Sequence, residues 1–223
     1  LGAPDLDVRF VGGCVRNAIL NQPITDLDIG TPEPPPTVLK RLQRAGIRAI
    51  PTGIAHGTVT AVIGKQSYEI TSLRRDTACD GRHADVAFTT DWEEDARRRD
   101  FTINAMSLRE DGALFDYHGG CDDAKAGRVR FVGAANDRIQ EDYLRILRLF
   151  RFFAWYGREP IDQATLNAVA ILKGGLTRLS AERITQEIAK LLAATDPASA
   201  VALMARAEVL ATVLPGARPD ALG

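Results

Sequence analysis

The chain has few cysteines, almost no net charge and no long apolar run, and each absence excludes something. Its three cysteines, Cys14, Cys79 and Cys121, lie far apart and form no C-x-x-C pair, which argues against a disulfide framework and a zinc site. The three histidines are equally scattered. No apolar run approaches the length of a membrane span. We therefore expect a reducing compartment, the cytoplasm, with no zinc and no membrane partner.

The charge balance gives no global signal for nucleic acid, although it leaves room for local basic surfaces. With 28 Lys and Arg against 29 Asp and Glu, the net charge is −1, whereas nucleic-acid binding usually leaves a basic excess. Arginines are nevertheless concentrated at 97–99 and again at Arg138, Arg145, Arg148 and Arg151. A phosphate-rich ligand could use both groups. The alternative is a solvated helix face, which we prefer for Arg97 and Arg98 alone.

The most informative stretch runs from Phe10 to Thr31, FVGGCVRNAILNQPITDLDIGT. An apolar run leads to a Gly-Gly turn, a predicted helix and then Asp26-Leu27-Asp28. If this last segment is extended, its period of two puts both carboxylates on one face. Paired carboxylates repel unless a cation lies between them, and Mg²⁺ takes one or two of them together with substrate phosphate oxygens. The Gly-Gly turn would let backbone N–H groups approach such phosphates.

Each of these pieces alone has a plainer interpretation. A lone Asp-x-Asp is more often turn or helix-cap chemistry, and a lone Gly-Gly is usually only a tight turn. Their order within about twenty residues favours a metal and triphosphate site.

The same stretch resembles the opening of the class II CCA-adding family, which comprises bacterial tRNA nucleotidyltransferases and poly(A) polymerases. The usual form there is Gly-Gly-x-Val-Arg-Asp followed by Asp-x-Asp. The resemblance implies that Asp26 and Asp28 hold two Mg²⁺ ions and that Gly12, Gly13 and Arg16 hold the triphosphate. Asn17 stands where the family usually has Asp, which removes a charge but keeps a short hydrogen-bonding side chain.

A second match begins at Arg99, in the string RDFTINAM. It is close to the family's Arg-Arg-Asp-Phe-Thr-Ile-Asn-Ala signature and is much more specific than an Asp-x-Asp pair. By resemblance, Arg99 binds the incoming nucleotide and Asp100 lies near its sugar. Phe101 and Ile103 are better explained as core residues.

Glu69 lies in one of two β-rich runs, 58–63 and 67–73, which a Gly64 turn joins into a predicted hairpin. A single Glu on a strand is usually a solvent-face residue. The chain resembles the wider polymerase-β-like nucleotidyltransferases, in which a third acid from a neighbouring strand completes the metal site. That resemblance implies a catalytic role for Glu69 beside Asp26 and Asp28.

The segment from Arg138 to Tyr156 has no strong breaker and has apolar residues at helical spacing, which predicts one long helix. Asp142 and Arg145 are then neighbours on one face, and the plain interpretation is an intrahelical ion pair beside a basic stripe. The segment also resembles the family's neck motif. That resemblance implies that Asp142 and Arg145 read the base, with Arg148 and Arg151 as further nucleotide contacts. Tyr143 stands where the family often has Pro.

Several further elements follow from local signals. We expect helices at 37–45, capped by Thr37, at 91–98, and at 161–172, 180–192 and 198–210. We expect a short strand at 47–50, a hairpin within 108–115 and a strand at 127–132. The polar segment that follows Asp76 is typical of a mobile loop, with Gly81 as its pivot.

Together these observations predict an α+β protein with a polymerase-β-like head built on a small mixed sheet. We expect the head at residues 1–136, an all-α neck at 137–194 and the start of a helical body at 195–223. The chain begins at Leu1, and the family continues into tRNA-holding domains, so we expect a piece of a longer protein. The implied activity is addition of C and A to the 3′ end of tRNA from CTP and ATP. The alternatives are a poly(A) polymerase, an A-only or CC-only enzyme, or an inactive RNA-binding module; no oligomeric state is predicted.

Overall fold

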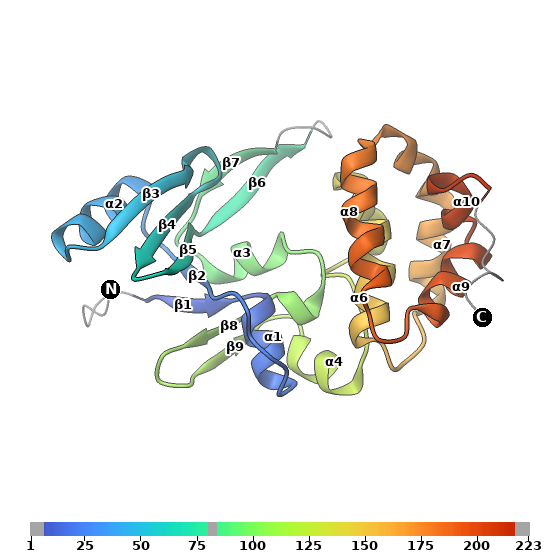
Figure 1. The fold of residues 1–223 in the computed structure, drawn as a ribbon, viewed down its shortest axis with the longest axis horizontal. Helices are drawn as coiled ribbons and strands as arrows, with labels where there is room; N and C mark the ends of the chain where they lie inside the picture. Colours follow the sequence, from blue (N-terminus) through green and yellow to red (C-terminus); the bar gives the residue numbers. More distant parts are fainter. Residues whose placement is uncertain (1–6, 80–83, 217–223) are drawn as a thin grey trace. The chain divides into compact units, whose positions relative to one another are not determined.

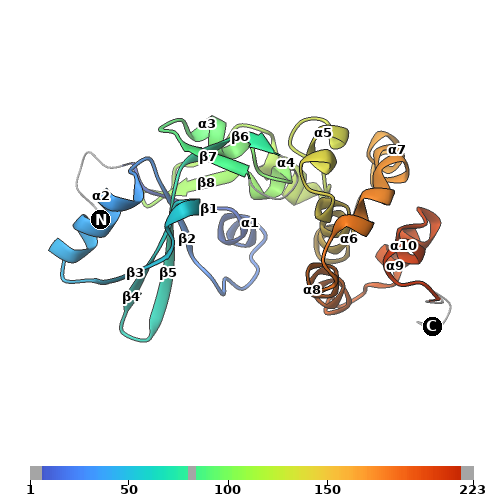
Figure 2. The same cartoon turned by 90° about the horizontal axis from the view of Figure 1, so that it is seen from above.

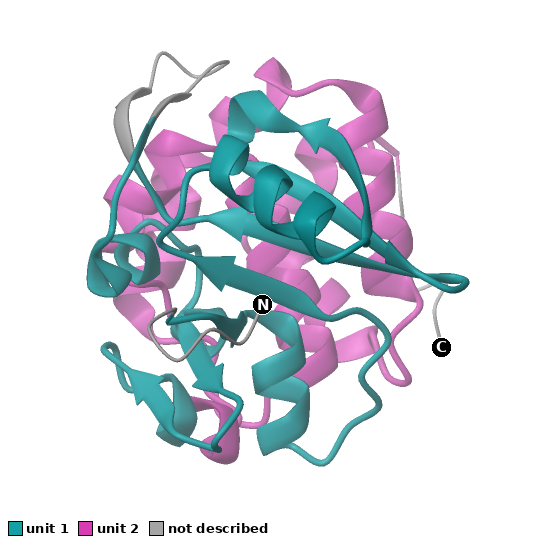
Figure 3. Cartoon of the chain, turned by 90° about the vertical axis from the view of Figure 1, so that its left-hand side faces the viewer, with its two compact units in different colours: residues 1–122 teal, residues 123–223 magenta. Residues whose placement is uncertain are grey.

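The computed structural model describes residues 7–79 and 84–216 of the chain. The chain divides into two compact units, Leu1–Asp122 and Asp123–Gly223 (Figure 3). Within the described ranges, no helix is both long enough and apolar enough to span a membrane. The predicted domain limits after residues 136 and 194 stay predictions.

The first unit is built on a seven-stranded sheet with the order β3-β4-β5-β2-β1-β8-β9 (Figure 1). Its strands are β1 (Arg9–Val11), β2 (Asp28–Thr31), β3 (Arg48–Gly53), β4 (Thr58–Ile63), β5 (Gln66–Ser72), β8 (Met106–Arg109) and β9 (Leu114–Asp116). Strands β2 and β5 are parallel, and the other neighbours are antiparallel. The sheet is therefore mixed, which confirms the predicted fold class, and both predicted hairpins and the strand after Ile47 are present.

Helices flank this sheet. They are α1 (Gly13–Ile19), α2 (Pro35–Arg44), α3 (Trp92–Arg97) and α4 (Gly120–Ala126), with 3₁₀ turns η1 (Ile54–His56) and η2 (Thr102–Asn104). Helix α2 lies beside β3 and β4 (Figure 2), where Val38 and Leu42 pack on Val59 and Ile70. The predicted Thr37 cap was wrong because α2 begins at Pro35, and proline is tolerated in a first helical turn.

A second sheet replaces part of the predicted mobile loop. Strands β6 (Arg74–Cys79) and β7 (Ala84–Phe88) pair antiparallel. The prediction of a loop was therefore wrong for these residues, because pairing with a partner strand gives a polar segment an order that its own composition does not reveal. The predicted pivot Gly81 lies outside the described residues.

The second unit is helical. Its elements are α5 (Ala135–Glu141), α6 (Leu144–Tyr156), α7 (Gln163–Leu172), the 3₁₀ helix η3 (Lys173–Arg178), α8 (Ala181–Leu192), α9 (Ala198–Arg206) and α10 (Val209–Val213). Helix α6 is central, since it packs against α8 and α9 and buries Phe150 and Phe152. The predicted helix at 198–210 is interrupted at Glu208, which has a φ of 58°.

The long helix predicted from Arg138 to Tyr156 was also wrong, because it breaks at Asp142. There the backbone is extended, with φ −154° and ψ 107°. The Asp142 carboxylate accepts a hydrogen bond from the Leu144 N–H at 3.0 Å. A short acidic side chain that binds the backbone in this way competes with helix continuation and starts α6 afresh.

The strand predicted at 127–132 is absent as well. This segment has only an isolated bridge at Phe131. Its arginines are held instead by the buried Asp123 carboxylate, which lies 3.0 Å from Arg128 Nε and 2.9 Å from Arg130 Nε. Side-chain ion pairs rather than a strand partner therefore fix its course.

Candidate nucleotide and metal site

The predicted carboxylates Asp28 and Glu69 lie on adjacent strands in direct register. Asp28 begins β2 and is the partner of Glu69 in the parallel pair with β5. Directly paired residues project from the same face of a sheet, so the expectation that Glu69 lies beside the strand of the paired acids is met. Asp26 is exposed and precedes the strand, so the predicted extended segment is paired in the sheet only from Asp28 onward.

The electrostatics at Asp28 suit a bound cation. Although Asp28 is exposed as a residue, its carboxyl is partly desolvated, and this raises the pKa of Asp28 above its usual value; the charge of Arg99 lowers it and that of Asp26 raises it. No three His, Cys, Asp or Glu side chains in the described part of the chain are grouped so as to hold a metal ion. Two carboxylates completed by oxygens of a substrate would fit Mg²⁺, which seldom has an all-protein cage.

The Gly12-Gly13 turn joins β1 to α1 and carries an arginine at close range. Gly12 has a φ of +74°, and its N–H donates to the Met106 carbonyl at 3.2 Å. A Cβ at Gly12 would lie 3.0 Å from Arg99 Nη1. Glycine is therefore required here both by the left-handed backbone and by the close approach of Arg99.

The Arg99 guanidinium is fixed by Asp95, which sequence reasoning missed. Asp95 is buried and accepts from Arg99 Nη2 at 3.1 Å, from Arg98 Nη2 at 2.6 Å and from the Arg74 N–H at 3.2 Å. Burial alone would raise the pKa of Asp95, but the charges of Arg99 and Arg98 and their hydrogen bonds keep it below its usual value. The interpretation as a solvated helix face was therefore wrong for Arg98. It fits Arg97, which pairs with exposed Glu93.

Asn104 links the two remaining predicted residues of this unit and was also missed. Its side-chain oxygen accepts from Arg16 Nη1, and its amide donates to Asp100 Oδ1 at 3.1 Å. Asp100 in turn accepts from the Phe101 N–H at 2.8 Å. Phe101 itself is fully buried, as predicted. Asn104 was visible in the matched string, but nothing local indicated that an amide 88 residues away would meet Arg16.

In the second unit, the predicted base-reading residues are each engaged by the chain itself. Asp142 accepts from Arg183 Nη2 of α8 at 2.7 Å. Arg145 pairs with Glu141 and donates to the Arg138 carbonyl at 2.9 Å. The intrahelical pair considered between Asp142 and Arg145 therefore gives way to partners on α5 and α8.

The two further arginines of α6 converge on one buried acid. Glu187 of α8 is buried and lies 2.6 Å from Arg151 Nε and 3.8 Å from Arg148 Nη1. Both guanidiniums also lie over the Phe152 ring, with centroid distances of 4.3 Å for Arg151 and 5.4 Å for Arg148. Glu187 was not predicted, because only the packing of α6 on α8 brings it to these arginines.

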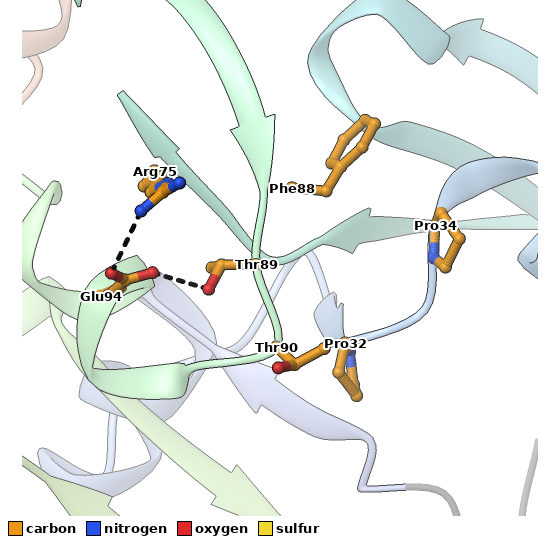
Figure 4. A pocket seen from close by; sticks show the side chains of 7 residues that line it. All are labelled: Pro32, Pro34, Arg75, Phe88, Thr89, Thr90 and Glu94. Carbon is orange, nitrogen blue, oxygen red and sulfur yellow. Dashed lines mark hydrogen bonds and ion pairs between the residues drawn. The ribbon is translucent and has the colours of Figure 1, made fainter. Parts of the chain in front are cut away.

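A separate hollow of about 450 Å³ lies in the first unit (Figure 4). It is lined by Pro32, Pro34, Arg75, Phe88, Thr89, Thr90 and Glu94. Glu94 accepts from Thr89 Oγ1 at 2.7 Å and lies 3.8 Å from Arg75 Nη1. None of the predicted site residues lines it.

Comparison with known proteins shows the family to which the chain belongs. The chain belongs to the poly(A) polymerase head domain family, whose model matches residues 8–130. A second model, the probable RNA- and SrmB-binding site of polymerase A, matches residues 160–220. The family generally uses a divalent metal ion.

Among curated relatives, the chain is similar to the human mitochondrial CCA tRNA nucleotidyltransferase 1, with 49% identity over 189 residues. The matched residues cover 83% of this chain and 44% of that protein. It is also similar to the CCA-adding enzyme of Oceanobacillus iheyensis, with 43% identity over 82% of this chain and 45% of the relative. The chain thus spans about half the length of the curated relatives it matches.

Two solved structures are similar over nearly the whole chain. The CCA-adding enzyme of Bacillus stearothermophilus in complex with CTP has a TM-score of 0.84 and 35% identity, over 96% of this chain and 51% of that one. A tRNA nucleotidyltransferase complexed with a primer tRNA and an incoming ATP analog has a TM-score of 0.77 and 28% identity, over 96% and 60%. These likenesses agree with the predicted polymerase-β-like head.

Proposed function

We propose that this chain is the catalytic part of an RNA nucleotidyltransferase that adds C and A to the 3′ end of tRNA from CTP and ATP. The RNA 3′-hydroxyl attacks the α-phosphate, its proton passes to solvent, a new phosphodiester P–O bond forms, and the bond to the β-phosphate breaks to release pyrophosphate. The observation that carries the proposal is the register pairing of Asp28 with Glu69 in a chain whose Arg99 lies against the Gly12 turn.

Asp26, Asp28 and Glu69 are the proposed catalytic residues, and Asp26 and Asp28 are the proposed ligands of Mg²⁺. Two such ions would be held there, and when bound, one would activate the attacking hydroxyl and the other would neutralise the triphosphate. The repulsion between Asp28 and Asp26 and the register of Asp28 with Glu69 support this assignment, because neighbouring carboxylates are stabilised by a cation. Glu69 would add negative charge on the face from which Asp28 projects.

The triphosphate is proposed to lie at the Gly12-Gly13 turn. Gly12, whose own N–H is bound to the Met106 carbonyl, would let the turn approach closely, the Gly13 N–H would donate to a phosphate oxygen, and Arg16 and Arg99 would supply positive charge. Asp100 is proposed to lie near the sugar. Asp95 and Asn104 hold these side chains in place, so the binding geometry is prepared before the nucleotide arrives.

Base choice is proposed to depend on Asp142 and Arg145. A guanidinium donates to ring and carbonyl acceptors of cytosine, and a carboxylate accepts from an exocyclic amine. Their present partners, Arg183 and Glu141, already orient both side chains. Arg148 and Arg151 are proposed as further nucleotide contacts.

The alternatives named above share these residues. A poly(A) polymerase or an enzyme that adds only A or only CC would use the same head, and an inactive RNA-binding module of the same fold would lack incorporation altogether. The curated relatives named as CCA-adding enzymes favour the first proposal. We propose the cytoplasm as its compartment, although one of those relatives is named as mitochondrial.

The test is incorporation by the intact protein into tRNA. Three substrates, ending before the CCA sequence, after one C and after both C residues, are incubated with Mg²⁺ and each labelled NTP. We expect C on the first two and A on the third. Adenylate added to all three would indicate a poly(A) polymerase, and no incorporation at all would indicate the inactive module.

A further inference from the structure

Asn17 makes hydrogen bonds in two directions, and each needs a different end of its amide. Its oxygen accepts from Arg16 Nε at 3.1 Å and from Arg16 Nη2 at 2.9 Å. Its nitrogen donates to the Pro23 carbonyl at 2.8 Å. A guanidinium can only donate and a carbonyl can only accept, so both partners fix the same orientation of the amide.

The second direction leads to the connection that carries Asp26. Residues 21–26, between α1 and β2, are all exposed. Asn17 ties this connection to α1 twice, because its backbone carbonyl also accepts from the Gln22 N–H at 2.8 Å. Pro23 has no N–H to donate, so its carbonyl is the group through which that residue can be hydrogen-bonded.

The first direction leads to the triphosphate side of the site. Arg16 is buried, and its Nη2 would lie 3.5 Å from a Cβ placed on Gly13. Its Nη1 donates to Asn104, on the other side of the guanidinium from Asn17. Asn17 therefore touches both the arginine beneath the Gly-Gly turn and the loop that bears Asp26.

We propose that Asn17 is a positioning residue that holds the Arg16 guanidinium and the Asp26 loop in one arrangement. An Asp at this position, which the family pattern favours, would still accept from Arg16. It would face the Pro23 carbonyl with oxygen against oxygen and would lose that hydrogen bond. The neutral amide is thus what joins the two halves of the site. The inference rests on the proposed roles of Arg16 and Asp26.

The test uses Asn17→Asp, Asn17→Ala and the control Gln22→Ala in the intact protein. Gln22 lies on the same connection, but only its backbone takes part in the tie to Asn17. Amide hydrogen exchange is followed over residues 20–27, and the nucleotide KM and the Mg²⁺ concentration at half-maximal rate are measured for each variant.

We expect Asn17→Asp to speed loop exchange and raise the Mg²⁺ requirement, each by about five-fold, which is the worth of one hydrogen bond. Its nucleotide KM should stay within about two-fold, because Arg16 keeps its acceptor. Asn17→Ala should raise the nucleotide KM as well, and Gln22→Ala should change none of the three.

If Asn17→Asp leaves the exchange and the Mg²⁺ requirement at their wild-type values, the proposal is wrong. A change in nucleotide KM alone would also overturn it, since Asn17 would then serve only Arg16. If the unmodified protein incorporates no nucleotide, the proposed function fails, while the hydrogen exchange still decides whether Asn17 orders the loop.

Discussion

At the scale of single residues, the acids of the first unit are distinguished by what surrounds them. Asp28 and Glu69 are both exposed, yet they are register partners on adjacent strands. Asp95 is buried and forms ion pairs with two arginines, Arg98 and Arg99. An exposed pair is available to a ligand, whereas the buried acid is committed to the chain. We therefore assign chemistry to the first two and support to the third.

The role of Glu69 is tested by its amide. Glu69→Gln keeps the shape of the side chain but removes its charge, so we expect kcat to fall by about 10- to 100-fold while the nucleotide KM changes by less than about three-fold. Single-turnover kinetics separate the chemical step from binding. If kcat and the nucleotide KM both stay near their wild-type values, Glu69 is an ordinary solvent-face residue and the catalytic assignment is wrong.

At the scale of elements, the residues of the proposed site are fixed mainly at the junctions between helices and strands. The turn between β1 and α1 receives Arg99, and the end of α3 is joined to the start of β6 because Asp95 accepts from the Arg74 N–H. In the second unit, the break between α5 and α6 places Asp142 opposite Arg183 of α8. A substitution at such a junction should therefore affect stability and the site together.

Asp95 gives a prediction of this kind. Asp95→Asn should lower the free energy of unfolding at neutral pH by about 2 kcal/mol, because a buried carboxylate with charged donors becomes a neutral amide. The folded-state pKa of Asp95 is lowered. Its stabilising contribution is therefore complete above the unfolded pKa, about 4, and is lost as pH falls through the lower folded value.

Chemical denaturation of both proteins between neutral and acid pH measures this difference. The gap between wild type and Asp95→Asn should close as the pH falls below about 4. Glu93→Gln is the matched control, since Glu93 forms an exposed pair with Arg97 on the same helix and should cost less than about 1 kcal/mol. If the difference in unfolding free energy stays constant across this pH range, the ion pairs of Asp95 are not its cause.

The elements also show what local sequence can and cannot specify. The hairpin of β4 and β5 and the helices that begin near Asp91 and Ser180 follow from neighbouring residues, and they were predicted. The break at Asp142 was not, because helical periodicity continues across it and only the side chain's own hydrogen bond stops the helix. Strands β6 and β7 were missed for the complementary reason, since each depends on its partner.

At the scale of the whole molecule, the residues proposed for chemistry and those proposed for base choice belong to different compact units. The residues proposed for metal and triphosphate lie in the first, and those proposed for the base lie in the second. Sequence reasoning could propose both sets, because most of their residues lie in contiguous motifs. It missed Asp95, Asn104 and Glu187, which act through contacts made only by the folded chain.

The division predicts that base choice can be damaged without damaging chemistry. Arg145→Ala and Asp142→Ala should each relax selectivity against UTP and GTP by about 10-fold, the worth of one good base contact, while incorporation continues. Competitive incorporation of all four NTPs measures this. Arg206→Ala, an exposed arginine at the end of α9, is the control. Full retention of C and A preference by both variants would mean that base selection lies elsewhere and that the arginines of α6 are RNA-phosphate contacts instead.

The central claim is that Asp28 belongs to a metal site for nucleotide transfer, and one measurement tests it most directly. Asp28→Ala and the control Asp111→Ala, an exposed acid in the turn between β8 and β9, are compared with wild type for Mg²⁺-dependent addition of C and A to tRNA. We expect Asp28→Ala to lose at least about 100-fold in rate with an unchanged unfolding transition, because a ligand matters more than its supporting shell. Incorporation by Asp28→Ala at a rate near that of wild type would contradict the account.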